Sequence, residues 1–249
     1  MHWESITWEE LPDALEACHH TALLPVGATE QHGPQLGLGT DSWIAERVCC
    51  DVSRETGVLK LPCLNYGCSL GHSHQWPGTI ALPPKVLIDA VYHIGAWAHR
   101  SGVRRLLMVN AHVTNHAPLR CALEMLRYEF EDLMVAIINT AELSQRVKES
   151  FFADAQDWHA NAAETALLLA HEPSWVRPDK LSASDDPDRT QGCVFSHPVH
   201  HTSSNGVTGF PSQASESMGQ ELLGMMVEDL CTLVRGAQSE VPPLSSSYL

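Results

Sequence analysis

The sequence predicts an α/β fold, a three-layer α/β/α sandwich with a mostly parallel central sheet. Short apolar runs typical of buried strands alternate along the chain with longer segments whose apolar residues recur at helical spacing. Such alternation is typical of a parallel sheet that helices cover on both faces. The 249 residues, of which 44% are hydrophobic, are enough to form one large core, so we expect a single domain over residues 1–249.

The expected strands are apolar runs that end at glycine or polar residues. The first ends at Gly27, and the fourth ends before Asn110. The Pro77-Gly78 pair marks a turn before the third. In chain order, the expected strands cover residues 21–26, 58–64, 79–82, 104–109 and 133–138.

The expected helices lie between and after these strands and carry apolar residues down one face. Pro84 opens the second helix, because proline is tolerated in a first helical turn. A segment rich in Pro, Asp, Ser, His and Gly, at about 173–211, predicts a long irregular stretch, and the chain is expected to end in a tail from about residue 237. The expected helices cover residues 41–55, 84–100, 117–131, 141–150, 162–171 and 215–234.

The charge balance excludes some classes of partner. Fifteen Lys and Arg against 30 Asp and Glu give a net charge of −15, which argues against binding to nucleic acid or to anionic lipid. No apolar stretch is long enough to span a membrane. The first ten residues do not resemble a signal peptide, and none of the eight cysteines forms a CxxC pair, so we expect reduced thiols and a cytoplasmic protein.

Histidine is as abundant as Lys and Arg together, with 15 residues, and this excess suggests a metal or acid–base site. In open α/β sheets, ligands bind at the carboxyl ends of strands. The loop after the first strand holds Glu30 and His32, and Asp41 opens the next helix. Glu30 and His32 are two positions apart and would point to opposite faces, so they could serve two metal ions with Asp41 between them. Alternatively, His32 and Asp41 are turn and capping residues.

Two further segments carry candidate residues. His112 directly follows the expected strand at 104–109 and is well placed as a ligand. Glu164 opens an apolar helix, where a carboxylate also has a structural explanation in the helix dipole. His159 is either a general base, a substrate ligand or a loop residue. Earlier in the chain, the turn-rich stretch 66–79 offers polar groups suited to a substrate-binding rim, of which we single out Ser69, His74 and Trp76.

Carboxylates and imidazoles without thiolates suit zinc, manganese or iron. Two such ions bridged by a carboxylate activate a water and polarise a carbonyl, which is the chemistry of amide hydrolysis. The chain has no GxSxG elbow, P-loop or GxGxxG pattern, so phosphate and nicotinamide chemistry are unsupported.

These motifs together resemble the creatininase (creatinine amidohydrolase) family, over residues 5 to 235. The resemblance implies a creatininase-like α/β/α domain with a dinuclear metal centre, often in a hexamer, that hydrolyses cyclic amides or formamides. The segments that carry it are Pro25-Val-Gly-Ala-Thr-Glu30-Gln-His32-Gly33-Pro34, Thr40-Asp41, Trp76-Pro77-Gly78-Thr79, Asn110-Ala-His112, His159-Ala with Glu164-Thr165, and Asn205-Gly-Val-Thr-Gly209.

The resemblance also implies roles for single residues. Glu30 and His112 would bind one metal ion and His32 the other, with Asp41 as the bridge. Glu164 would be a ligand of the second ion, and His159 would bind substrate or transfer a proton.

The chain departs from the family pattern at two places. Thr114 stands where creatininase proper has a glutamate ligand, which shifts the second site towards Glu164 and leaves Thr114 as a candidate substrate contact. Asn161 and Ala162 replace a glycine and a carboxylate of the motif that begins at His159.

The expected function is therefore that of a metal-dependent hydrolase with two divalent ions (Zn, Mn or Fe). A metal-bound hydroxide would attack a small cyclic amide, a lactam-like compound, a formamide or a ring ketone. The departures also fit an inert relative that only binds a small molecule, or an isomerase with a single metal ion. We expect a homo-oligomer, in which His197, His200 and His201 either line a neighbour's site or are exposed.

Overall fold

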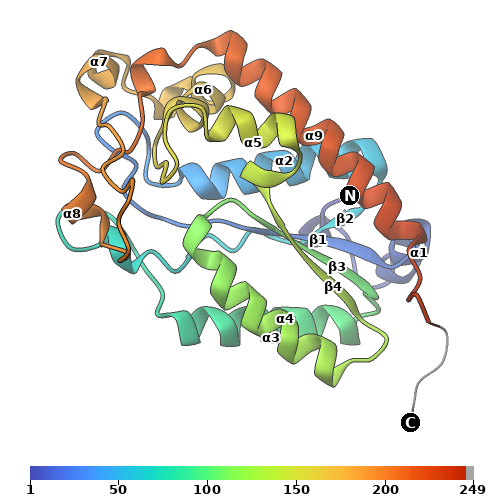
Figure 1. Cartoon of the computed structure of the whole chain (residues 1–249). Coiled ribbons are helices and arrows are strands. Elements are labelled where there is room, and N and C mark those ends of the chain that lie inside the picture. The colour runs from blue at the N-terminus through green and yellow to red at the C-terminus, as the bar shows by residue number, and fades with distance from the viewer. Residues whose placement is uncertain (245–249) are drawn as a thin grey trace.

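A four-stranded parallel sheet divides the computed structural model, which describes residues 1–244, into three layers (Figure 1). The sheet has the order β2-β1-β3-β4, and all its pairs are parallel. This arrangement confirms the predicted α/β class. The strands are β1 (Thr21–Val26), β2 (Leu59–Lys60), β3 (Arg105–Asn110) and β4 (Met134–Asn139).

The two central strands are buried on both faces, which explains why their sequences are continuous apolar runs rather than alternating ones. Leu23 of β1 and Leu107 of β3 point into one core, whereas Leu24 and Leu106 point into the other. Side chains thus alternate between two cores, one on each side of the sheet.

Helices cover both faces of the sheet. One face packs against α2 (Thr40–Thr56), α5 (Gln145–Phe151), α6 (Ala162–His171) and α9 (Glu216–Ser239). The opposite face packs against α1 (Leu11–Ala17), α3 (Pro84–Arg100) and α4 (His116–Glu129). Figure 1 shows α3 and α4 on one side of the sheet and α2, α5, α6 and α9 on the other.

The expected strand at 79–82 is wrong. The Ile80 and Leu82 N–H groups donate to the carbonyls of Thr29 and Gly67, which lie in loops, so the segment joins no strand of the sheet. The strand expected at 58–64 is much shorter, because β2 holds only two residues and an isolated bridge then joins Leu64 to Val26.

Several helices also differ from expectation. A 3₁₀ turn at Thr140–Glu142 precedes α5, which begins after Ser144 because the Ser144 hydroxyl accepts a hydrogen bond from the Val147 N–H. The sequence did not predict α1. The helix α9 runs to Ser239, beyond the start of the expected tail, whose residues 245–249 lie outside the described residues.

The stretch at 173–211 is largely irregular. Its short helices are Pro173–Trp175, Pro178–Lys180, α7 (Leu181–Ser184), α8 (Val199–Thr202) and Pro211–Gln213. The remaining 3₁₀ turns of the described chain are Trp3–Ser5, Leu70–His72 and Val113–Asn115. Among the described helices, none combines the length and the apolar character that a membrane crossing requires. All eight cysteines are free thiols.

Gly219 sets the distance between α6 and α9. A Cβ atom at Gly219 would lie 1.9 Å from the Ala166 carbonyl oxygen, so only glycine permits this approach. We expect Gly219→Ala to lower the free energy of unfolding by about 1–3 kcal/mol through overpacking. Gly224→Ala, in the same helix, meets no atom within 4 Å and should raise it by up to about 1 kcal/mol. Urea denaturation of both metal-free variants checks this, and equal effects would contradict it.

Candidate metal centre

Five acidic and imidazole side chains meet beyond the carboxyl ends of β1 and β3. Each of them is at most 5% exposed, so the cluster is withdrawn from water. Glu30 and His32 come from the loop after β1, Asp41 from the first turn of α2, His112 from the end of β3 and Glu164 from the first turn of α6.

Asp41 lies at the centre of this cluster. Its Oδ1 is 3.2 Å from His32 Nε2, and its Oδ2 is 3.3 Å from His112 Nδ1. Glu30 Oε2 is 3.3 Å from His112 Nε2, and Glu164 Oε1 is 3.7 Å from His32 Nε2. The cluster thus has two halves, Glu30 with His112 and His32 with Glu164, that share one carboxylate.

Burial and neighbouring charges shift the pKa of each group. Burial raises the pKa of Glu30 to about 7. Burial alone would also raise the pKa of Asp41, but His32 and His112 outweigh it and hold this pKa below its usual range. Burial alone would lower the pKa of both imidazoles. The facing carboxylates reverse this, raising the pKa of His112 to about 9 and that of His32 well above its ordinary value.

Four buried atoms of the cluster have no hydrogen-bond partner among the described residues. They are both carboxylate oxygens of Glu30, Asp41 Oδ2 and His32 Nε2. A buried polar atom without a partner is costly, and bound cations satisfy such oxygens and nitrogens. Glu30, His32 and Asp41 can also bring one ligand atom each within 4.8 Å of one another. The donor set therefore fits divalent metal ions.

His159 lies beside both halves. Its Nδ1 is 3.6 Å from Glu30 Oε1, and its ring centroid is 4.5 Å from that of His32. Its Nε2 is 2.8 Å from the Gln31 carbonyl oxygen, which can only accept a hydrogen bond. This contact is shorter than the 3.2 Å between His159 Nε2 and the Gln31 side-chain nitrogen. We therefore assign the hydrogen to Nε2, which leaves Nδ1 as the basic nitrogen that faces the cluster. Burial lowers the pKa of His159 well below its ordinary value.

The late glycine turn holds His159 in place. The backbone of His159 pairs with that of Thr208 through two hydrogen bonds. The Gly206 carbonyl accepts a hydrogen bond from Gln31 Nε2, and a Cβ atom at Gly206 would lie 2.0 Å from Gln31 Oε1. Glycine is required at 206 because this contact is so close and because its φ is +89°.

Asn161 orients Glu164, although it replaces the family's glycine. Its side chain caps α6 by accepting a hydrogen bond from the Glu164 N–H, and its Nδ2 donates to Asp154. Ala160, at a φ of +50°, donates its N–H to Glu164 Oε2 at 2.7 Å. One Glu164 oxygen is thus fixed by the backbone while the other faces His32.

The structure adds His72, which we did not single out. Its Nδ1 is 3.7 Å from Glu30 Oε1 and 3.2 Å from Gln31 Nε2. Burial lowers its pKa to about 3, so this imidazole is neutral. It lies in a short 3₁₀ turn without hydrophobic periodicity. The only sequence signal was its place in the turn-rich stretch 66–79.

The residues expected at the substrate rim differ in burial and in their distance from the cluster. Ser69 is buried, with its Oγ 3.4 Å from His112 Nε2, and Thr114 donates its hydroxyl hydrogen to the Cys68 carbonyl. His74 is exposed, with its ring 5.1 Å from that of His200. Neither His74 nor Trp76 is among the described residues that line the two cavities beside the cluster.

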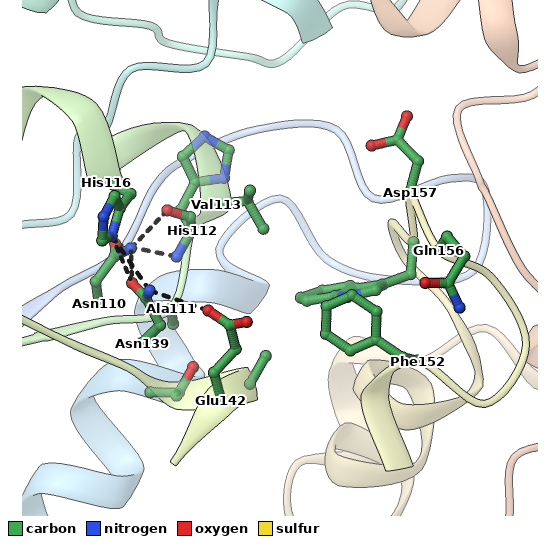
Figure 2. Close-up of a pocket in the computed structure, with 13 residues that line it drawn as sticks. Asn110, Ala111, His112, Val113, His116, Asn139, Glu142, Phe152, Gln156 and Asp157 are labelled. Atoms are coloured by element: carbon green, nitrogen blue, oxygen red, sulfur yellow. Dashed lines mark hydrogen bonds between the residues drawn. The ribbon is translucent and has the colours of Figure 1, made fainter. Parts of the chain in front are cut away.

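The first of these cavities is an open cleft of about 510 Å³ over the cluster, lined by Asp41, His112, His159 and Glu164. Residues 190–199 form its outer edge, including His197 and the exposed Phe195. His201 is exposed. The second cavity, of about 360 Å³, lies beside His112 and is drawn in Figure 2.

The sequence matches that of known proteins over most of its length. The family model for creatininase, described as creatinine amidohydrolase, matches residues 4–234. The chain is 30% identical to the creatinine amidohydrolase of Pseudomonas putida, over 96% of each chain. It is 31% identical to the mycofactocin precursor peptide peptidase of Mycobacterium ulcerans, over 83% of this chain and 81% of the relative.

Solved structures agree with this relationship. A mutant creatininase of the Zn-Zn type and a creatininase described as Mn are each 27% identical to the chain, with a TM-score of 0.82. Both alignments cover 96% of this chain, and they cover 98% and 99% of those proteins respectively. The match of the family model, the relatives and the shared fold show that this chain belongs to the creatininase family of amidohydrolases.

Proposed function

We propose that this creatininase-family hydrolase holds two divalent metal ions and hydrolyses the C–N bond of a small amide. The observation that carries the proposal is the position of Asp41, whose two carboxylate oxygens face different halves of the cluster at 3.2 and 3.3 Å. A carboxylate that faces two sets of ligands is suited to bridge two ions.

The ligands divide between the two ions as the halves of the cluster do. Glu30 and His112 would hold one ion, His32 and Glu164 the other, and Asp41 both. Oxygen and imidazole donors suit zinc, manganese or iron, in agreement with the Zn-Zn and Mn forms of the similar creatininases. When bound, such ions polarise a carbonyl and make a water more acidic.

His159 is our candidate for proton transfer. Its basic Nδ1 faces the cluster, and the Gln31 carbonyl fixes the other nitrogen, so the ring cannot turn without losing a hydrogen bond. A neutral imidazole can accept a proton from water and return it to the departing nitrogen. Thr114 lies beside His112 and lines the cleft over the cluster, so it is our candidate for a substrate contact. The Ser69 hydroxyl is buried beside His112 and is not among the described residues that line either cavity.

The substrate is an amide in this proposal. The two named relatives are a creatinine amidohydrolase and a peptide peptidase, and both names support a cyclic amide, a formamide or a peptide-like amide as the substrate. The homo-oligomer, the cytoplasmic location and the single domain stay predictions.

Loss of the bridging carboxylate should remove both metal ions. We expect about two equivalents of metal per wild-type chain and well under one in Asp41→Asn, measured by plasma mass spectrometry on protein without a histidine tag. Asp51→Asn is the matched control, because Asp51 lies in the same helix and its ion-pair partners among residues 1–244 are Arg47 and Arg54. Two equivalents in Asp41→Asn would contradict the bridge, and one in the wild type would indicate a single-metal enzyme.

Metal binding should also stabilise the fold, because it satisfies buried atoms that otherwise have no partner. At a free metal concentration of 100 times Kd, the stabilisation is about 2.7 kcal/mol. We expect chelation to lower the Tm of the wild type and zinc or manganese to restore it. The Tm of Asp41→Asn should not respond to either treatment, and an equal response would argue against binding at the cluster.

Removal of the proton-transfer group should slow the reaction without emptying the site. On an amide that the wild type hydrolyses, found by screening cyclic amides, formamides and short peptides, we expect His159→Gln to lower kcat about 10²- to 10⁴-fold. Its metal content should stay at the wild-type value. His93→Gln, at an exposed position of α3, controls for histidine removal and should keep full activity. An unchanged kcat in His159→Gln would exclude this role.

A further inference from the structure

The cavity beside His112, here called the side pocket, is built from the ends of three segments. It is lined by residues that follow β3, residues 139–142 that follow β4, and residues 152 and 156–158 that precede α6. Its volume of about 360 Å³ is large enough for a substituent of several heavy atoms. Figure 2 shows Asn139, His116 and Glu142 on one side of it and Phe152, Gln156 and Asp157 on the other.

The side pocket adjoins the metal centre. Six residues line both the side pocket and the cleft over the cluster: Ala111, His112, Val113, Gln156, Asp157 and Trp158. Glu142 lines the side pocket and not the cleft. The imidazole of His112 is therefore a shared wall, with ligand atoms facing Glu30 and Asp41 and a flank towards the side pocket. A substrate whose amide lies at the cluster can extend past His112 into this space.

One wall of the side pocket is polar and fixed by hydrogen bonds. Asn110 Nδ2 donates to Asn139 Oδ1 at 3.1 Å, and Asn139 Nδ2 lies 3.3 Å from Glu142 Oε2. Lys148 donates to the other Glu142 oxygen at 2.9 Å from outside the pocket, since it is not a lining residue. The Glu142 carboxylate is thus held at the wall by contacts on both of its oxygens.

The opposite wall is aromatic and ends in a second carboxylate. Phe152 and Trp158 meet edge to face, with ring centroids 6.0 Å apart. Asp157 is adjacent, and no described Lys or Arg pairs with its side chain. None of the described residues that line the side pocket is a lysine or an arginine. Carboxylates and aromatic faces both attract cations. Lys148, which is not a lining residue, already pairs with Glu142 and lies 5.2 Å from the centroid of the Phe152 ring, so among the described lining residues Asp157 is the carboxylate without a Lys or Arg partner.

We propose that the side pocket binds the non-reacting end of the substrate and selects a positively charged nitrogen group, such as an ammonium. The inference rests on the proposed function, because the amide must lie at the cluster for its substituent to reach the pocket. Asp157 supplies most of the charge, and Glu142, whose charge Lys148 partly offsets, adds to it. Trp158 and Phe152 supply aromatic surface for the group and its methylene chain.

Three hydroxamates of equal chain length test the proposal, because a hydroxamate chelates metal ions and places the far end of the molecule in a defined direction. They derive from ε-aminocaproic, caproic and adipic acid and end in an ammonium, a methyl group and a carboxylate. Titration calorimetry on the zinc-loaded protein should give the lowest Kd for the ammonium compound, about tenfold below that of the carboxylate compound.

Charge-neutralising variants locate the preference. In Asp157→Asn the ratio of the two Kd values should fall at least about threefold, and Glu142→Gln should lower it independently. Glu149→Gln removes the same charge from α5 outside the pocket and should leave the ratio unchanged. Metal content and Tm of each variant show that the site and the fold are intact.

The outcomes separate this inference from the proposed function. If the three compounds bind in a metal-dependent manner with equal Kd, or if the ratio survives both pocket variants, the charge selection is wrong and the metal centre stands. If none binds more tightly to the zinc-loaded than to the metal-free protein, the metal centre itself is wrong and the inference falls with it.

Discussion

The architecture of the site depends on one buried carboxylate. Asp41 is 2% exposed and faces two imidazoles from different parts of the chain, His32 and His112. A buried charge without partners would be prohibitive, so these contacts fix the separation of the loops after β1 and β3. Asp41 also lies in the first turn of α2, where the helix dipole favours negative charge. The parallel sheet brings the carboxyl ends of β1 and β3 together, and Asp41 contacts the histidines that follow them, His32 and His112.

Two hydrogen bonds hold the backbone of Ala160, beside the cluster, in a strained conformation. Ala160 has a positive φ, a conformation that costs about 1–3 kcal/mol for a residue with a side chain. Both of its polar groups are engaged, because its N–H donates to Glu164 and its carbonyl accepts from Gln35 Nε2 at 2.8 Å. The strained backbone of Ala160 thus directs its N–H at the Glu164 carboxylate. Asn161 fixes the same residue from the other side, because its side-chain oxygen accepts a hydrogen bond from the Glu164 N–H.

Sequence reasoning worked where the chain has a strong local signal. The central strands are buried on both faces, so their apolar runs were unambiguous, and ligand candidates directly follow two of them. It failed at 79–82, where tertiary hydrogen bonds shape an irregular backbone and the expected strand is absent from the described sheet. It also did not single out His72, whose Nδ1 lies 3.7 Å from Glu30 Oε1. No periodicity distinguishes two histidines two positions apart in a turn. The roles of the ligand candidates stay predictions that a measurement of metal content tests.

The candidate metal ligands and most walls of the side pocket come from different segments of the chain. The residues that could hold metal follow β1 and β3 and open α2 and α6. The side pocket shares His112 with this set, and its other walls include residues 139–142, 152 and 156–158, which hold none of the candidate metal ligands. In this chain the small Ala141 and the carboxylates of Glu142 and Asp157 give that wall its space and its charge, so substrate selection should follow these loops rather than the metal ligands.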